Sequence, residues 1–227
     1  MSLEAVCFDL DDTLYDYHQY ARAGLRRAAD HLEGETGRQF FDELLSIYFI
    51  EDVTRGTFDE LVDRHDLDPA LIEDLVEAFH GAQSPLQPYP ATEPVLERLG
   101  ESYRLGLLTD GRAGAEKLRR LGIGTYFDAR LVTPTIDASK HDPAVFERLL
   151  STLSVPPANA VYVGDDPRVD FRCANELGMR TVRLRRGRYR TLEPETPKHR
   201  ADREIQTLGS LPGILDSDRD TGEGSTN

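Results

Sequence analysis

The sequence has only two cysteines in 227 residues. Cys7 lies in an apolar run and Cys173 in a predicted helix, so they form neither a disulfide framework nor a paired metal site. We interpret both as reduced thiols that pack as small apolar side chains. Long apolar runs are also absent. None approaches the roughly 20 residues of a transmembrane helix, which excludes a membrane span.

The first ten residues, MSLEAVCFDL, lack the basic flank and the small-residue cleavage site of a secretory signal. We therefore predict a cytoplasmic location. Hydrophobic residues make up 39% of the chain and charged residues 30%, which is typical of a globular protein.

Positive charge is scarce. The chain has 27 basic and 41 acidic residues, which gives a net charge of -14. Such a field excludes nucleic acid as an expected partner. Only three of the basic residues are lysines, Lys117, Lys140 and Lys198. An acidic, lysine-poor surface is similar to that of proteins from extreme halophiles, in which concentrated salt screens the repulsion. The composition predicts a halophilic habitat, and it makes each retained lysine worth examining.

Four apolar runs, each followed by polar or acidic residues, predict strands at 5–8, 105–108, 129–132 and 160–163. A fifth and more polar strand is predicted at 180–184, nearer an edge. Helical segments alternate with the later strands, with ends marked by Gly122, Asp142-Pro143 and Gly178. This alternation predicts an α/β fold, a Rossmann-like parallel sheet with helices on both faces. The ligand site of such a sheet lies beyond the carboxyl ends of its strands.

Residues 15–90 break this alternation. Their apolar spacing predicts helices over 17–32 and 40–49. Two more are predicted, one from Thr57 with Glu60 as a capping box and one that begins at Asp68-Pro69 and closes before Gly81. A strand-free block of this length is too long for an ordinary crossover. We predict a helical cap over 15–90 that acts as a lid, a catalytic core over 1–14 and 91–215, and a disordered acidic tail over 216–227.

Chemically suited residues follow the predicted strands. Asp9 and Asp11 come directly after the first strand in DLDDT, and Thr109 ends the second. Lys140 precedes a helix, and Asp165 and Asp170 follow the fourth strand. Two carboxylates separated by one residue suit a nucleophile and a proton donor, although acidic turns after strands are common without any such role.

In order and spacing, these segments resemble the four motifs of the haloacid dehalogenase-like (HAD) hydrolase superfamily, from Ala5 to about Arg190. The resemblance implies a Rossmann-like core with an inserted helical cap, a Mg²⁺ cofactor and an aspartyl intermediate. It makes Asp9 the nucleophile and Asp11 the general acid and base. It also implies that Thr109 and Lys140 hold the phosphoryl group, and that the metal ligands are Asp9, Asp11 through its backbone carbonyl, Asp165 and Asp170.

Electrostatics supports this interpretation independently. Carboxylates about 4 Å apart repel one another by roughly 4 kcal/mol per pair at an effective dielectric constant of about 20. A cluster of this kind therefore needs cations, which Mg²⁺ and Lys140 would supply.

The residue at position 11 separates the possible reactions. Dehalogenases of the superfamily resemble D-x-Y at this motif, since a departing halide needs no proton, whereas Asp11 favours a phosphatase. A phosphomutase is the closer alternative. A non-catalytic phospholigand-binding or interaction protein is an alternative of another class, which the complete set of motif residues disfavours. We predict an enzyme, a Mg²⁺-dependent phosphomonoester hydrolase acting on a small phosphorylated metabolite.

Further residues are predicted near the phosphate or the substrate, namely Asp110, Gly111, Tyr15 and His18. His141 follows Lys140 where the family often has proline, and the roles of His141 and Asp166 stay open. For the basic run Arg183–Arg190, ion pairs with the surplus carboxylates or contacts with a neighbouring subunit are favoured over binding of a polyanionic substrate. The sequence indicates neither the particular substrate nor the oligomeric state.

Overall fold

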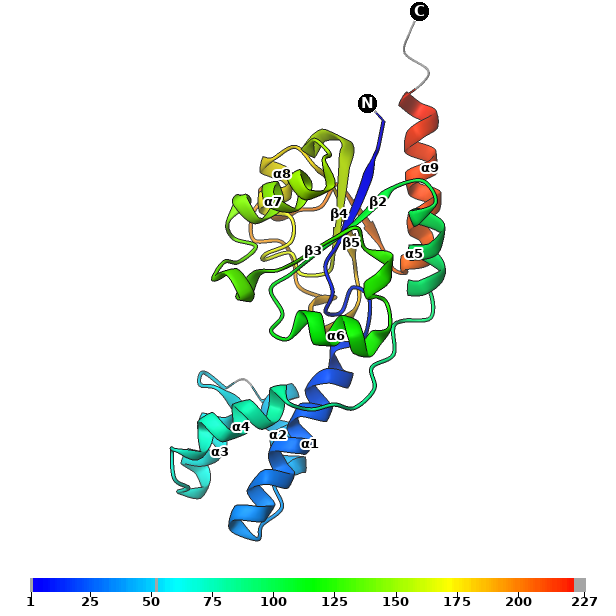
Figure 1. Cartoon of the computed structure of the whole chain (residues 1–227). Helices are drawn as coiled ribbons and strands as arrows, with labels where there is room; N and C mark the ends of the chain where they lie inside the picture. Colours follow the sequence, from blue (N-terminus) through cyan, green and yellow to red (C-terminus); the bar gives the residue numbers. More distant parts are fainter. Residues whose placement is uncertain (1, 52, 223–227) are drawn as a thin grey trace, which may run out of the picture. The chain divides into compact units, whose positions relative to one another are not determined.

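The computed structural model describes residues 2–51 and 53–222, without the side chains of 218–222. The chain forms two compact units, one from Met1–Asp16 with Gln87–Asn227 and the other from Tyr17–Leu86 (Figure 1). The first unit is built on a parallel sheet and the second on helices alone. The predicted α/β fold with a Rossmann-like sheet is confirmed.

The sheet has six parallel strands in the order β3-β2-β1-β4-β5-β6. Their bounds are β1 Ala5–Phe8, β2 Arg104–Thr109, β3 Ala129–Val132, β4 Ala160–Gly164, β5 Arg180–Leu184 and β6 Arg203–Ile205. The first five lie where the apolar runs predict them. β6 has the sequence REI, and its single apolar residue gives no run from which a strand could be predicted.

The strand order reverses direction beside β1. The chain passes from β1 to β2 and β3 on one side and then crosses to β4 on the other, so that Ala5 pairs with both Arg104 and Ala160. The Asp9 backbone N–H extends the pairing by donating to the Val163 carbonyl at 2.9 Å. A reversal of this kind opens a crevice at the carboxyl ends of the two strands. Asp9 and Asp165 directly follow these two strands.

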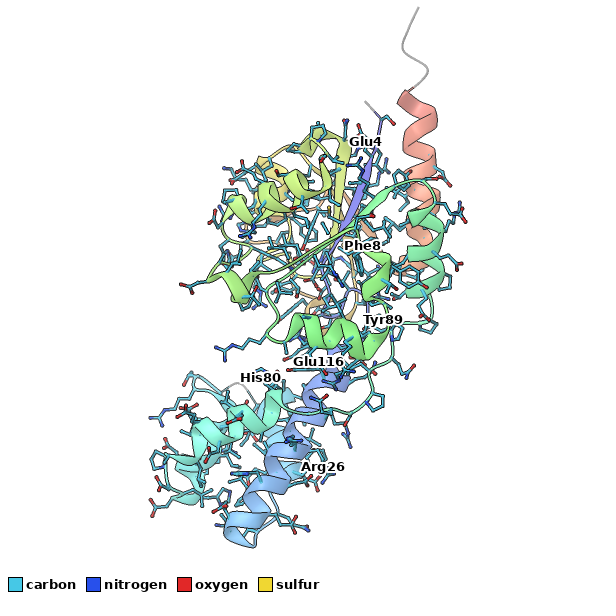
Figure 2. All side chains as sticks on the ribbon, in the orientation of Figure 1. Glu4, Phe8, Arg26, His80, Tyr89 and Glu116 are labelled. Atoms are coloured by element: carbon cyan, nitrogen blue, oxygen red, sulfur yellow. The ribbon has the colours of Figure 1, made fainter. Side chains whose placement is uncertain are left out.

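Helices pack on both faces of the sheet (Figure 1). Those that contact the strands are α5 Thr92–Gly100, α7 Pro143–Leu153 and α8 Arg172–Glu176, whereas α9 Leu211–Gly222 packs against α5. The unit also contains α6 Gly114–Leu121. Ala5 and Cys7 of β1 share a buried cluster with Phe146 of α7. Phe8, labelled in Figure 2, follows the alternation of the strand to the other face and meets the Phe127 ring edge-on. As predicted, α7 begins at Pro143 after an Asp142 cap.

Short 3₁₀ segments complete this unit at Gly124–Tyr126, Thr133–Ile136, Pro157–Asn159, Gly187–Tyr189, Pro197–His199 and Leu208–Ser210. Across the described ranges, helices that pair sufficient length with sufficient apolar character to traverse a bilayer are absent.

The helical unit consists of α1 Tyr17–Thr36, α2 Phe41–Phe49, α3 Thr57–His65 and α4 Leu71–His80. α1 and α4 are joined by a 2.9 Å hydrogen bond between Tyr20 Oη and Nδ1 of His80, the last residue of α4. His80 is labelled in Figure 2. The expected capping box at α3 is not formed, because Gly56 occupies the N-cap position and Thr57 is already helical. That this unit acts as a lid stays a prediction.

The C-terminal segment differs from the predicted disordered tail. α9 continues over residues 216–222, while residues 223–227 lie outside the described residues. Leu211 and Leu215 are buried, and Arg98 of α5 pairs with Asp216 at 2.8 Å. The buried leucines lie in the first part of α9, and the helix continues from them into the polar residues that begin at Asp216.

The loop after β1 is held by the segment after β5. Arg186 donates to the backbone carbonyls of Asp12 and Thr13, and Arg188 Nε pairs with the buried Asp12 carboxylate at 2.5 Å. Arg185 pairs with two glutamates, Glu193 and Glu204. Ion pairs within the chain therefore account for Arg185 and Arg188 of the basic run.

We expect Gly187→Ala to lower the free energy of unfolding by about 3 kcal/mol, measured by urea denaturation. Gly187 has a φ of +65°, and a Cβ there would collide with the Asp12 side chain. Left-handed strain costs an alanine about 1 kcal/mol, and the collision adds about 2 kcal/mol. The control is Gly178→Ala, at φ +81° with open space around it. Equal losses of unfolding free energy in the two variants would contradict the close packing of Gly187 against Asp12.

Candidate active site

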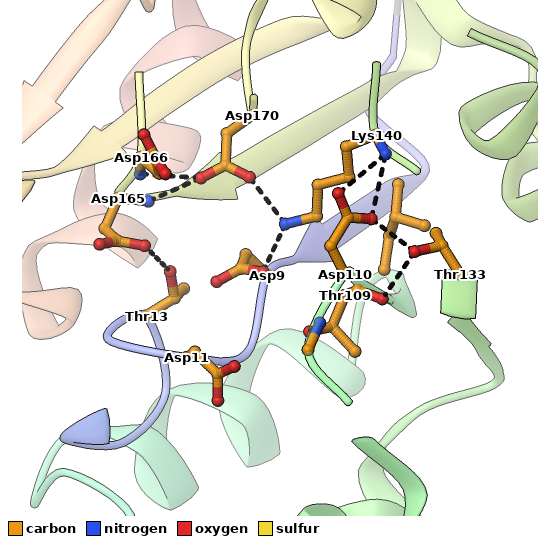
Figure 3. A network of polar contacts seen from close by, with 12 residues as sticks. Asp9, Asp11, Thr13, Thr109, Asp110, Thr133, Lys140, Asp165, Asp166 and Asp170 are labelled. Atoms are coloured by element: carbon orange, nitrogen blue, oxygen red, sulfur yellow. Dashed lines mark hydrogen bonds and ion pairs between the residues drawn. The ribbon is translucent and has the colours of Figure 1, made fainter. Parts of the chain in front are cut away.

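Lys140 joins two aspartates at the carboxyl ends of β1 and β4 (Figure 3). Its Nζ contacts the Asp9 carboxylate and donates to Asp170 Oδ1 at 2.8 Å. All three side chains are buried. They come from three separate segments, namely the loop after β1, the loop before α7 and the loop after β4. The sheet therefore gathers residues that lie far apart in the sequence.

Asp165 completes a group of three carboxylates. Oxygen atoms of Asp9, Asp165 and Asp170 all lie within 4.8 Å of one another. Asp165 Oδ1 accepts from the Thr13 hydroxyl at 3.3 Å, whereas the buried Asp165 Oδ2 has no hydrogen-bond partner among the described residues. An unpartnered buried carboxylate oxygen is costly, and a cation is a suitable partner for it.

Asp170 is fixed by the backbone of the β4 loop. Its Oδ2 accepts from the backbone N–H groups of Asp165 at 3.1 Å and Asp166 at 2.9 Å. Gly164 allows this approach, because a Cβ at that position would collide with the Asp170 side chain. The orientation of Asp170 is thus determined before any ligand binds.

Burial dominates the electrostatics of this group. It raises the pKa of Asp9 to about 7; Lys140 opposes the rise, and the charges of Asp170 and Asp11 add to it. Burial also raises the pKa of Asp165, with repulsion from Asp9 added. Burial alone would lower the pKa of Lys140, but the Asp170 and Asp9 charges outweigh it and raise that pKa well above its usual value. One ammonium group thus faces three carboxylates.

These residues fit a hard divalent cation. All the donors are oxygens, the carboxylates converge, and one oxygen is unpartnered. Asp9, Asp165 and Asp170 could hold such an ion by their side chains. The Asp11 carbonyl as a fourth ligand stays a prediction.

The Asp11 carboxylate belongs to a second cluster. Lys117 Nζ lies 2.8 Å from its Oδ1 and 2.7 Å from its Oδ2, and the Tyr15 hydroxyl donates to Oδ1 at 2.6 Å. Lys117 lies outside the four motifs, so the motifs alone do not predict it as a site residue. A signal was present, since Lys117 lies on the buried stripe of α6 with Gly114, Leu118 and Leu121. A lysine on an apolar stripe indicates a buried acidic partner.

Thr109 and Asp110 end β2. The buried Thr109 accepts from the Gly111 N–H at 3.1 Å. The Asp110 carboxylate accepts from the Lys140 backbone N–H at 3.0 Å and from the Thr133 hydroxyl at 2.5 Å (Figure 3). Asp110 thus holds the segment that carries Lys140. Contact of Thr109, Asp110 and Gly111 with a phosphate stays a prediction.

The remaining predicted residues have protein partners. Tyr15 is fully buried against Asp11, and the exposed His18, in the helical unit, stacks on Phe49 at 4.7 Å. Their contact with substrate stays a prediction. The His141 carbonyl accepts from Arg172 at 2.8 Å, and Asp166 pairs with Arg168 at 2.8 Å. Through these contacts, His141 and Asp166 help to hold the surrounding loops in place.

Asp9, Lys140, Asp165 and Asp170 therefore lie together at the carboxyl edge of the sheet, and comparison with known proteins identifies the family. The family model described as haloacid dehalogenase-like hydrolase matches residues 6–184, more than half of the chain. The chain belongs to this family. The predicted membership and the prediction of a hydrolase are confirmed.

Several relatives match over almost their whole length. A glyceraldehyde 3-phosphate phosphatase of Methanopyrus kandleri is 36% identical, over 94% of this chain and 97% of the relative. The crystal structure of a HAD phosphatase from Thermococcus onnurineus is 30% identical, with a TM-score of 0.64 over 94% of this chain and 98% of that one. A 2-haloacid dehalogenase structure from Pseudomonas syringae pv. tomato is 27% identical, with a TM-score of 0.67 over 95% and 99%.

We predict that Mg²⁺ raises the melting temperature more at about pH 8 than at about pH 5. The folded-state pKa of Asp9, about 7, lies above its unfolded value of about 4. Between these values the folded state binds more protons, so the stability of the metal-free protein falls as pH rises. Mg²⁺ competes with these protons and restores the lost stability at high pH.

The measurement is thermal unfolding followed by circular dichroism, with EDTA or with saturating Mg²⁺. Asp165→Asn should reduce the Mg²⁺-dependent rise, whereas Asp216→Asn, at an exposed ion pair, should not. An equal rise at both pH values would exclude the carboxylate group as the metal site.

Proposed function

We propose that this protein is a Mg²⁺-dependent phosphomonoester hydrolase that acts on a small phosphorylated metabolite through an aspartyl-phosphate on Asp9. The observation that carries the proposal is the separation of two carboxylates into different surroundings. Asp9 lies with Lys140 in the buried carboxylate group, whereas Asp11 is paired with Lys117. This separation supports bond formation by one acid and proton transfer by the other.

In the first half-reaction, an Asp9 oxygen attacks phosphorus, and the bond to the leaving alkoxide breaks. Asp11 supplies the proton that the alkoxide takes. Lys140, in contact with Asp9, offsets the charge of nucleophile and phosphate, and Thr109 binds a phosphoryl oxygen. A Mg²⁺ held by Asp9, Asp165 and Asp170 would neutralise charge that develops on the transferring phosphoryl group.

In the second half-reaction, water attacks the phosphorus of the acyl-phosphate, and the bond from phosphorus to Asp9 breaks. The water proton passes to Asp11, and inorganic phosphate leaves. Asp9 regains its carboxylate and its contact with Lys140. The fixed backbone contacts of Asp170 and Asp110 keep the surrounding charges in place through both steps.

The dehalogenase alternative is disfavoured by Asp11. A carboxylate that attacks carbon and expels a halide needs no proton donor beside it, whereas this chain holds Asp11 with Lys117 and Tyr15. A non-catalytic binding protein is disfavoured on the same ground. The phosphomutase would use both acids equally, and no observation among the described residues favours it.

The names of the relatives indicate a class of compounds to test as substrates. Since a relative that is 36% identical is named a glyceraldehyde 3-phosphate phosphatase, we propose triose phosphates as the first compounds to test.

We expect hydrolysis of p-nitrophenyl phosphate that requires Mg²⁺ and is strongest at high salt. Asp9→Asn should lower kcat by at least about 10³-fold, because an amide is a poor nucleophile. Phosphate release is measured, and Asp216→Asn is the matched surface control. Full activity of Asp9→Asn would remove Asp9 as nucleophile. Chloride release from 2-chloropropionate without phosphatase activity would favour the dehalogenase instead.

A panel of phosphorylated metabolites tests the substrate class. We expect the highest kcat/KM for small phosphomonoesters, with glyceraldehyde 3-phosphate among the best. Phosphate release identifies hydrolysis, whereas an isomeric sugar phosphate formed without phosphate release would identify a phosphomutase.

A further inference from the structure

Lys117 and Asp11 form a nearly buried ion pair beside the proposed nucleophile. The Lys117 side chain is 2% exposed and that of Asp11 14%. Nζ reaches both carboxylate oxygens, so the lysine constrains the rotation of the carboxylate as well as its position. The two residues are 106 positions apart in the chain, and only the folding of α6 onto the β1 loop brings them together.

A second donor fixes the same group. The Tyr15 hydroxyl, itself fully buried, donates to Asp11 Oδ1 at 2.6 Å. The pair also lies beside Thr109: a Cβ on Gly111 would lie 2.5 Å from Asp11 Oδ2, 2.9 Å from Lys117 Nζ and 3.2 Å from Thr109 Oγ1. Position 111 can therefore hold only glycine without moving these groups.

Stability alone does not explain a lysine at this place. Burying an ammonium group is unfavourable, and a buried ion pair is often no better for stability than apolar residues of similar volume. The other buried side chains of α6, those of Leu118 and Leu121, are apolar. The Lys117 ammonium group is costly to bury, and it contacts the carboxylate of the proposed acid and base, Asp11. This combination points to a role of Lys117 in the reaction.

We propose that Lys117 is a positioning residue, assisted by Tyr15, that holds Asp11 in the orientation of the base for the second half-reaction. This inference rests on the proposed function. In that step a water oxygen bonds to phosphorus, the bond from phosphorus to Asp9 breaks, and the water proton moves to an Asp11 oxygen. Lys117 keeps its own protons throughout. A carboxylate held by two donors is already oriented when water arrives, so the step needs no further ordering.

The test is rapid-mixing kinetics of Lys117→Met with p-nitrophenyl phosphate and Mg²⁺. p-Nitrophenolate leaves without protonation, so the first half-reaction should stay close to wild type. We expect about one equivalent of p-nitrophenolate in a burst, followed by a steady-state kcat at least about tenfold below wild type. KM should fall together with kcat, leaving kcat/KM within about twofold. A merely structural defect would lower kcat/KM and give no burst.

Two further comparisons separate positioning from general damage. If Lys117 acts through Asp11, then Lys117→Met should cause no further loss of kcat in an Asp11→Asn background. Lys198→Met, at an exposed ion pair, is the matched lysine control and should match wild type. If Lys117→Met fails to fold, Tyr15→Phe removes a single hydroxyl and should give the same pattern with a smaller loss.

The proposal is overturned by a kcat of the tested variant within about twofold of wild type, by a fall in kcat/KM without a burst, or by an undiminished loss in the Asp11→Asn background. Failure of the proposed function has a different signature: the wild-type protein would then release no phosphate from any phosphomonoester, and this inference would fall with it.

Discussion

The structure depends on how charge is compensated at the carboxyl edge of the sheet. Asp9, Asp11, Asp12, Asp165 and Asp170 are among the aspartates that lie there, and a protein with a net charge of -14 has few cationic side chains to neutralise them. Lys140 forms ion pairs with Asp9 and Asp170. Lys117 pairs with Asp11, and Arg188 pairs with Asp12. Asp165 retains an oxygen without a partner in the described part of the chain, which suits a metal ion. Two of the three lysines are thus used in one place.

The loops bring these charges together and hold them. The strand reversal between β1 and β4 places two acidic loops side by side. Backbone N–H groups fix Asp170, Asp110 anchors the segment of Lys140, and Arg186 holds the loop after β1 by its carbonyls. Because each loop is tied by polar contacts, the carboxylates remain close despite their repulsion. Such preorganisation lets a site stabilise charge without rearranging during the reaction.

Two separate pairings of lysine and carboxylate give the site two chemical roles. Asp9 shares Lys140 with Asp170 deep in the cluster, whereas Asp11 is oriented by Lys117 and Tyr15. Phosphoryl transfer through a covalent intermediate needs both a nucleophile and a group that moves protons. Neighbouring acids with different partners can divide that work. A dehalogenase needs no second acid to move protons. A fold similar to that of dehalogenases therefore does not distinguish dehalogenation from phosphoryl transfer, whereas the partners of Asp11 bear on that choice.

The sequence by itself determined five strands, the inserted helices and the motif residues, because apolar runs, helical spacing and the order of the motifs are local signals. It missed β6, whose sequence REI has a single apolar residue, and the helical course of residues 216–222, whose polar composition gives no apolar spacing. Only the tertiary structure decided the partners of Asp11 and Asp12, because Lys117 and Arg188 lie 106 and 176 residues away. Ion pairs between such distant positions leave no periodicity in the chain and exist only once the sheet and α6 have packed.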